Sequence, residues 1–293
     1  MGAVFLWGAV ISAGGAFIIN SVFGISIYVL TGSETASNLT TSALIAPFIE
    51  EILKGIAVLL VFIFYYQEFD SFLDGILYAG IAALGFAATE NTYYIYTFGF
   101  LEQGWQGFKT LSIIRLGLVG WQHPFYSAFF GIGLATARLN QNRIVRFTAP
   151  FIGLGLAMAS HAIHNILATF FQGIGGISFS TIIDWIGWLM MLGFIFIAMR
   201  IEQSDLVINL KDEVELQNLT NSQYQTAVSG LKVSSSRIKS IFQGNYQKTT
   251  LLYRTAAKLA LKKKQFKRLG DEKDNVATIK ALREAVRNLS KSL

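Results

Sequence analysis

The chain has 293 residues, of which 53% are hydrophobic and 14% are charged, and its mean hydropathy is +0.47. Charged residues make up about a quarter of a soluble globular protein, so this composition predicts a membrane protein. The absence of cysteine excludes disulfide bonds and thiol chemistry.

Charge divides the chain into two parts. Residues 1–200 contain 7 Lys and Arg against 9 Asp and Glu, whereas residues 201–293 contain 17 against 9. We therefore expect an apolar membrane domain over 1–200 and a basic tail over 201–293.

Long apolar stretches recur along the first part. A helix needs about 20 mostly apolar residues to cross the hydrocarbon core of a bilayer. The stretches that qualify are 3–30, 42–65, 72–99, 111–137, 147–171 and 180–200. The predicted fold is therefore all-α, a polytopic membrane helix bundle of about six spans. The first span lacks the basic start of a signal peptide, so we expect it to be retained.

The basic residues of the loops predict the orientation. Arg138, Arg143 and Arg146 follow the fourth span, and Arg200 and the basic tail follow the sixth. The loops after the first, third and fifth spans contain one basic residue, Lys109. Because loops rich in Lys and Arg stay in the cytoplasm, both termini are predicted to be cytoplasmic.

The tail is expected to form a cytosolic helical hairpin. Residues 253–269 are a basic helix candidate, and apolar residues recur at spacings of three and four over 275–291. The run KKKQFKR at 262–268 suits anionic lipid or nucleic acid, but we interpret it as a solvated anchor beside membrane lipid. No wider nucleic-acid recognition motif is present, so no nucleic-acid partner is expected.

Ionisable residues lie inside the predicted spans. Each costs about 2.5–3.5 kcal/mol at the centre of a membrane helix on the insertion scale, which suggests function or a buried partner. At 1.5 Å per residue, Glu50, Glu90, His123 and His161 all fall roughly 12–18 Å from the outer ends of their spans. Two carboxylates and two histidines in one layer are the material of a metal site or an acid–base site.

Helical spacing relates these residues to their neighbours. Glu50 and Lys54 are four residues apart and are therefore able to pair, whereas Glu51 points about 100° away. Arg115 is expected to extend to the outer surface, and Asp184 is expected near the surface at a helix start. A structural interpretation stays open for each element: the Glu–Lys pair as a buried ion pair, and the histidines as interhelical hydrogen-bond partners.

Four segments resemble, in order, the motifs of the PrsW family of intramembrane proteases, which is related to the CAAX-protease and bacteriocin-processing superfamily. They are APFIEEILKG with its EExxK pattern, FDSFLDGILYAGIAALGFAATENTYY, HPFYSAFFGIGLATA and SHAIHN, and together they cover about residues 45–170.

The resemblance implies a membrane-embedded, metal-dependent protease. Carried over by position, Glu50, Glu51 and His123 are the essential residues, and His161 and Asn165 match the H-x-x-x-N motif. We expect Glu50 with His123 to position and deprotonate a water, and His161 with Asn165 to face the developing oxyanion. No role is carried over to His164.

If zinc is present, we expect His123, His161 and Glu90 to hold it and to leave the open fourth position that catalytic zinc requires. Glu90 has a second possible role, which is to orient a histidine. A mechanism that uses glutamate and histidine without a metal stays open.

The resemblance also implies a substrate and a location. Known PrsW activity cleaves a membrane-anchored anti-sigma factor, so a single-span membrane protein substrate and a bacterial plasma membrane are expected. A proton- or cation-coupled transporter and an inactive membrane scaffold are the competing functions. The sequence shows neither an internal repeat nor paired broken spans, which argues against the transporter.

Overall fold

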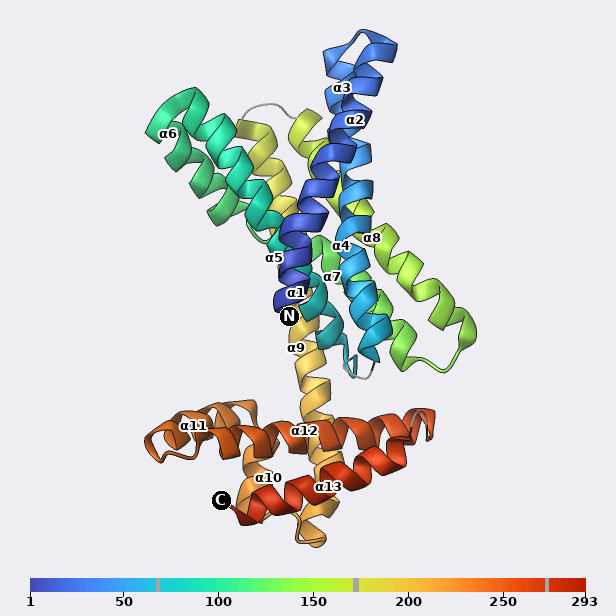
Figure 1. The fold of residues 1–293 in the computed structure, drawn as a ribbon, viewed down its shortest axis with the longest axis vertical. Coiled ribbons are helices and arrows are strands. Elements are labelled where there is room, and N and C mark those ends of the chain that lie inside the picture. Colours follow the sequence, from blue (N-terminus) through green and yellow to red (C-terminus); the bar gives the residue numbers. More distant parts are fainter. Residues whose placement is uncertain (67–68, 171–173, 272–273) are drawn as a thin grey trace. The chain divides into compact units, whose positions relative to one another are not determined.

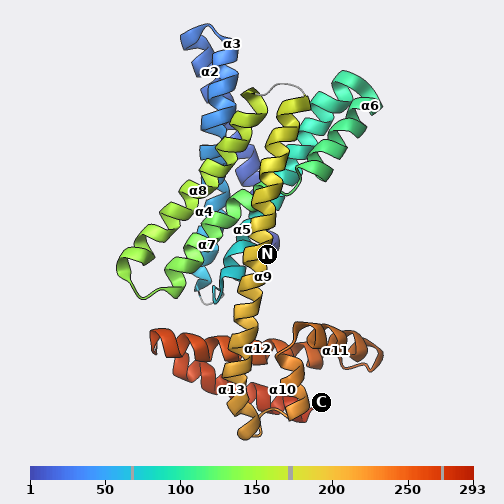
Figure 2. The same ribbon diagram turned by 180° about the vertical axis from the view of Figure 1, so that it is seen from behind.

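The computed structural model describes residues 1–66, 69–170, 174–271 and 274–293, and every element in these ranges is helical. The chain forms two compact units, Met1–Ile195 and Phe196–Leu293. Figure 1 and Figure 2 show the helices of each unit. The all-α prediction is confirmed.

The first unit begins with a helical hairpin. Helix α1 (Gly2–Leu6), the π-helical turn η1 (Trp7–Ser12) and α2 (Ala13–Thr31) follow one another without a break. The left-handed backbone of Gly32 (φ 66°) ends α2, and the Ser33 hydroxyl caps α3 (Glu34–Thr40). The π-helical turn η2 (Thr41–Ile45) then leads into α4 (Ala46–Phe64). The segment 31–41, which we expected to be a polar joint, is therefore largely helical.

The next segment contains a second helical hairpin. A capping box between Ser71 and Asp74 starts α5 (Phe72–Tyr94), which continues through η4 (Ile95–Phe100) into α6 (Leu101–Ser112). The chain reverses at Gly104 (φ 62°), inside the expected polar joint 101–109. It returns through η5 (Ile113–Leu118) alongside the outgoing arm.

The predicted fourth span, 111–137, is not one helix. The backbone leaves helical geometry after η5, and α7 runs over Gln122–Leu139. Pro124 therefore lies in the first turn of α7, where its missing N–H removes no intrahelical hydrogen bond. His123 stands at this start of a helix and not in the middle of a span.

Two long helices complete the first unit (Met1–Ile195), which is called the membrane unit from here on. Helix α8 (Arg143–Phe170) packs against α7, and α9 (Ile174–Glu215) continues well past residue 200, where we expected the last span to end. The end of the predicted fifth span, residue 171, lies outside the described residues.

Four helical stretches among the described residues are long and apolar enough to cross a membrane: Gly2–Thr31, Phe72–Leu139, Arg143–Thr169 and Ser178–Glu215. The second contains both α5 and α7, separated by the hairpin at Gly104. Helix α4 is not among the four, and its 19 residues include three ionisable side chains. The count of six spans and the predicted orientation stay predictions.

Helices α5 and α7 approach each other closely at a pair of glycines. A Cβ atom on Gly75 would lie 2.2 Å from the carbonyl oxygen of Gly131, and one on Gly131 would lie 2.1 Å from that of Gly75. Small side chains, including Ala79 and Ala135, continue this interface. The contact sets the spacing between the helices that carry Glu90 and His123.

The second unit has its own core. The last turns of α9 pack with α10 (Asn221–Ala227), α11 (Gly230–Phe242), α12 (Tyr246–Leu269) and α13 (Asn275–Lys291). Leu210, Leu252, Leu259 and Val286 are fully enclosed there. Helix α13 has the predicted bounds, whereas α12 begins seven residues before the predicted 253. A cytosolic location stays a prediction.

The basic run 262–268 is largely a structural element of this unit, contrary to our interpretation as a solvated anchor. Lys263 Nζ lies 2.5 Å from Asp212 Oδ1 and 3.0 Å from Glu213 Oε1, and Lys264 pairs with Asp205. Lys267 donates to Asn209 at 2.9 Å. The sequence shows these charges but not the acidic residues of α9 that neutralise several of them.

Replacing Gly131 by Ala is expected to destabilise the membrane unit by about 1–3 kcal/mol, because the added methyl group would overlap the backbone of α5. Gly80→Ala on α5 is the matched control, since no atom lies within 4 Å of its Cβ position. Thermal unfolding of the detergent-solubilised protein measures both. Equal midpoints for the two variants would contradict the proposed close contact.

Candidate active site

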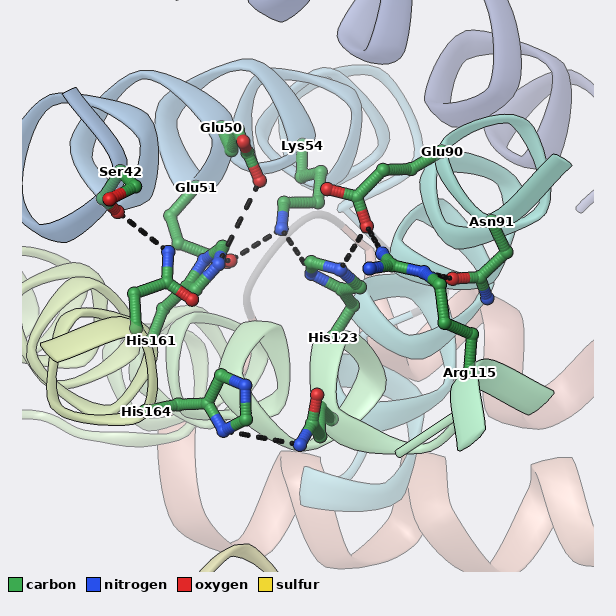
Figure 3. Close-up of polar contacts among 12 residues, drawn as sticks. Ser42, Glu50, Glu51, Lys54, Glu90, Asn91, Arg115, His123, His161 and His164 are labelled. Atoms are coloured by element: carbon green, nitrogen blue, oxygen red, sulfur yellow. Dashed lines mark hydrogen bonds and ion pairs between the residues drawn. The ribbon is translucent and has the colours of Figure 1, made fainter. Parts of the chain in front are cut away.

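Ionisable side chains from four helical segments meet inside the membrane unit (Figure 3). Glu50 and Glu51 come from α4, Glu90 from α5, His123 from α7 and His161 from α8. They adjoin a cavity of about 430 Å³, to which all but Glu51 contribute lining atoms. The predicted layer of two carboxylates and two histidines is therefore one cluster in space.

Glu51 is completely enclosed and fully engaged. Its Oε1 lies 2.5 Å from Lys54 Nζ and 3.0 Å from His161 Nδ1, and its Oε2 accepts a hydrogen bond from the Ser127 hydroxyl at 2.7 Å. Lys54 therefore pairs with Glu51, three residues away, and not with Glu50, the pairing that we considered from helical spacing. Glu51 lies between the lysine, the serine and the histidine, where its charge has three partners.

Glu50 is buried but poorly satisfied. Its Oε1 accepts a long hydrogen bond of 3.4 Å from Asn20, and its Oε2 has no hydrogen-bond partner. That oxygen lies 3.8 Å from His161 Nε2. Among the described residues, no Lys or Arg nitrogen lies within ion-pair distance of Glu50. A buried carboxylate oxygen without a donor is costly, so this position suits a cation or a reacting water.

His123 lies between a carboxylate and a lysine. Its Nε2 is 3.0 Å from Glu90 Oε2, and its Nδ1 is 3.3 Å from Lys54 Nζ. A lysine ammonium only donates, so Nδ1 acts as an acceptor and Nε2–H donates to Glu90. Because Glu90 holds Nε2, a metal ion bound by His123 would take the place of the Lys54 ammonium at Nδ1. His161 has the complementary arrangement, since Glu51 holds its Nδ1 and its Nε2 faces Glu50.

Arg115 is a site residue that the sequence did not place here. Its Nη2 lies 2.7 Å from Glu90 Oε2, its Nε donates to Asn91 at 2.8 Å, and its guanidinium lies 4.0 Å from the centre of the Tyr94 ring. We expected this side chain at the outer surface. The hairpin at Gly104 brings η5 back beside α5, where the half-buried Glu90 offers a stronger partner than water at the membrane surface.

Asp184 also lies inside, not at the surface. It is buried on α9, accepts a hydrogen bond from the Tyr126 hydroxyl at 2.8 Å, and its Oδ2 lies 2.5 Å from His164 Nδ1. The Tyr126 ring in turn stacks on the His161 ring, with centroids 5.1 Å apart and an interplanar angle of 19°. Asp184 and His164 thus support the ring that covers His161. The sequence indicated the buried position of Asp184 only through the presence of an acidic residue in an apolar span.

Asn165 lines the same cavity. Its amide nitrogen donates to the carbonyl oxygen of Ser42 at 2.7 Å, which joins α8 to η2. This bond uses one of the two amide hydrogens, so the second can serve another acceptor.

The ligand atoms of Glu50, His123 and His161 all lie within 4.8 Å of one another. Two histidines and one carboxylate are a ligand set of catalytic zinc. The unbonded Glu50 Oε2 fits such an ion, and the carboxylates of Glu51 and Glu90 contact the histidine nitrogens as outer partners of metal ligands do. Glu90, which we predicted as a ligand, lies outside this group and occupies the orienting position instead.

The balance of charge points the same way. Glu51 has Lys54 as its cation and Glu90 has Arg115, whereas Glu50 has neither. If both histidines are neutral, a divalent cation held by Glu50, His123 and His161 would compensate the negative charge of Glu50, which no lysine or arginine compensates. The residues therefore fit a metal ion.

These features define a helical membrane protein with a buried glutamate–histidine centre whose residues can hold a metal ion. Residues 1–199 match the family described as PrsW family intramembrane metalloprotease. The chain therefore belongs to the PrsW family, and the resemblance seen in the motifs is confirmed. No curated protein and no solved structure matches the chain. Membership of an enzyme family argues against the transporter.

Removing any member of the three-residue group should abolish zinc binding. Glu50→Gln, His123→Ala and His161→Ala each delete a ligand, whereas Glu90→Gln should leave a site weakened about 10–100-fold, because it removes only an orienting partner. Competition with a chromophoric chelator on solubilised protein measures the affinities. Retention of zinc by Glu50→Gln with its loss in Glu90→Gln would make Glu90 the ligand.

Lys54→Met should destabilise the protein by about 3–5 kcal/mol, because it leaves the Glu51 charge buried without its cation. Adding Glu51→Gln to this variant should recover part of the loss, since the unpaired charge is then gone. Chemical unfolding of wild type, the two single variants and the double variant gives the four free energies of unfolding that a double-mutant cycle needs. Additive effects of the two substitutions would contradict the pairing.

Proposed function

We propose that the protein is a zinc-dependent endopeptidase that cleaves single-span membrane proteins within or near the bacterial plasma membrane. The observation that carries the proposal is Glu50 Oε2, a buried acceptor without a donor, which faces His161 Nε2 at 3.8 Å beside a polar cavity. Peptide hydrolysis needs such a place, where a water can be held and deprotonated away from lipid.

Glu50, His123 and His161 would hold the metal, which when bound polarises the scissile carbonyl and makes a bound water more acidic. Glu50 has two oxygens to offer. Neither has a strong donor, since the single bond from Asn20 is 3.4 Å long. One oxygen can therefore face the ion while the other accepts the proton of the attacking water.

The surrounding residues hold the reacting groups in place. Glu51 fixes the ring of His161 through Nδ1, and Glu90 fixes His123 through Nε2. Lys54 and Arg115 keep those two carboxylates charged, so that they act as acceptors and not as proton donors. The second amide hydrogen of Asn165 is our candidate donor for the developing oxyanion.

The cavity suggests how a substrate enters. Its lining runs from the buried cluster to polar residues at the ends of helical segments, including Asn38 and Thr41 near η2 and Thr169 at the end of α8. The backbone of an extended peptide in this cavity could form hydrogen bonds with these polar side chains. Lipid acyl chains cannot provide such bonds. In the predicted orientation these segment ends lie on the outer side, with both termini cytoplasmic.

An anchored substrate fits this position. A single-span protein would bring a peptide bond near its membrane border to the cavity without leaving the bilayer. The membrane-anchored anti-sigma factor of the family's known activity is one candidate, and we propose the broader class of single-span proteins.

Glu50→Gln should eliminate cleavage, because it removes both the charge and the proton acceptor. Wild type and variant would be expressed at equal levels, and the membrane proteome searched for shortened single-span proteins. Glu102→Gln, the same change at an exposed residue of α6, is the control and should cleave normally. Identical fragments from wild type and Glu50→Gln would overturn the assignment.

A further inference from the structure

Helix α11 carries an apolar face that the second unit leaves uncovered. Leu231 and Phe242 are each 87% exposed, and Ile238 and Ile241 are each 58% exposed. At 3.6 residues per turn, Leu231, Ile238 and Phe242 lie within an arc of about 40°. These three side chains form one stripe along α11, whose ribbon is labelled in Figure 1.

The other side of α11 fixes the helix in place. Ser240 is buried, and Val233 packs against the core of the unit that contains Leu252 and Leu259. The Ser229 hydroxyl caps the first turn, and α11 contacts both α10 and α12. Because the inward side is occupied, rotation of the helix cannot bury the stripe without giving up these contacts.

Basic residues flank the stripe, and acidic residues are missing. Lys232 and Lys239 lie on one border, about 80–100° from Leu231, and Arg237 lies on the other side, about 120° away. Over 216–270 the chain has 11 Lys and Arg and no Asp or Glu. Several lysines of the run 262–268 are used inside the unit, as shown above, whereas Lys232 and Lys239 of α11 are exposed beside the apolar stripe.

We infer that α11 lies in the interface of a bilayer with anionic headgroups, with the stripe at the boundary between headgroups and acyl chains. An amphipathic helix with apolar residues on one face and Lys or Arg at its borders has the features of an interfacial helix. The long stems of the basic residues can lie along the apolar region while their charges reach phosphate groups.

Two features favour lipid over a protein partner. The stripe has no acidic residue at its borders, so a second copy of α11 would meet like charges. The same chain enters a membrane through its first unit, so the second unit is tethered near lipid at a high effective concentration. A helix too short to bind a bilayer strongly alone can do so when it is tethered.

The absence of cysteine makes a direct test available. Ile238→Cys places a single thiol on the stripe, and Ala277→Cys places one on an exposed position of α13 as the matched control. Each variant of the full chain is labelled with an environment-sensitive fluorophore. It is then reconstituted into vesicles of phosphatidylcholine, alone or mixed with phosphatidylglycerol, that contain a brominated lipid as quencher.

The expected result is strong quenching at position 238 in the mixed vesicles, weaker quenching in phosphatidylcholine alone, and little at position 277. Changing Lys232, Arg237 and Lys239 together to Gln should reduce quenching in the mixed vesicles to the phosphatidylcholine level.

Two results would overturn the inference. One is equal, low quenching at positions 238 and 277 in both lipids. The other is energy transfer between donor- and acceptor-labelled copies at position 238 without lipid quenching, which would assign the stripe to a second copy of the chain. Neither result bears on proteolysis, because the measurement does not use the active site.

Discussion

Charged groups placed where water is scarce must find partners within the protein, and this constraint organises the membrane unit. Glu51 is matched by Lys54, Glu90 by Arg115, and Asp184 by the Tyr126 hydroxyl and His164. Each pair links segments that are apart in sequence or adjacent turns of one helix, so the polar cluster also holds the bundle together. Glu50 departs from this pattern, since its Oε2 has no donor. Glu51, Glu90 and Asp184 thus have partners, whereas Glu50 faces a cavity with one oxygen unbonded, which makes it the strongest candidate for a reacting group among these four.

The cluster depends on helices that approach closely and on helices that break. Backbone contact at Gly75 and Gly131 brings α5 against α7, so that Glu90 can reach the ring of His123. The reversal at Gly104 returns η5 to the side of α5 and delivers Arg115. The break before α7 places His123 at a helix start, beside Pro124. In one unbroken span, Arg115 and His123 would lie eight residues, or roughly 12 Å, apart along the helix axis.

Sequence reasoning located the layer but not its connections. A fixed rise per residue grouped Glu50, Glu90, His123 and His161, which the structure brings together although the span assumed for His123 is not one helix. The motifs identified the family. The sequence did not give the ion-pair partners of Lys54 and Arg115, because tertiary structure decides them. Helical spacing allows Lys54 to meet either Glu50 or Glu51, and the choice is made by Ser127 and His161 from other helices. Arg115 was assigned to the membrane surface because the hairpin that brings it inward rests on the positive φ of one glycine, which hydropathy does not reveal.

The second unit shows why a basic sequence is not the same as a basic surface. The run 262–268 has the highest density of positive charge in the chain, yet Lys263 and Lys264 contact acidic residues of α9 and Lys267 contacts Asn209. A charge already paired within the fold has little left to offer a membrane. Helix α11 has fewer cations, but its Leu231 and Phe242 are exposed beside them. Interfacial binding needs both the burial of apolar side chains and the attraction of cations to anionic headgroups. Membrane contact should therefore follow the exposed amphipathic helix and not the densest basic run.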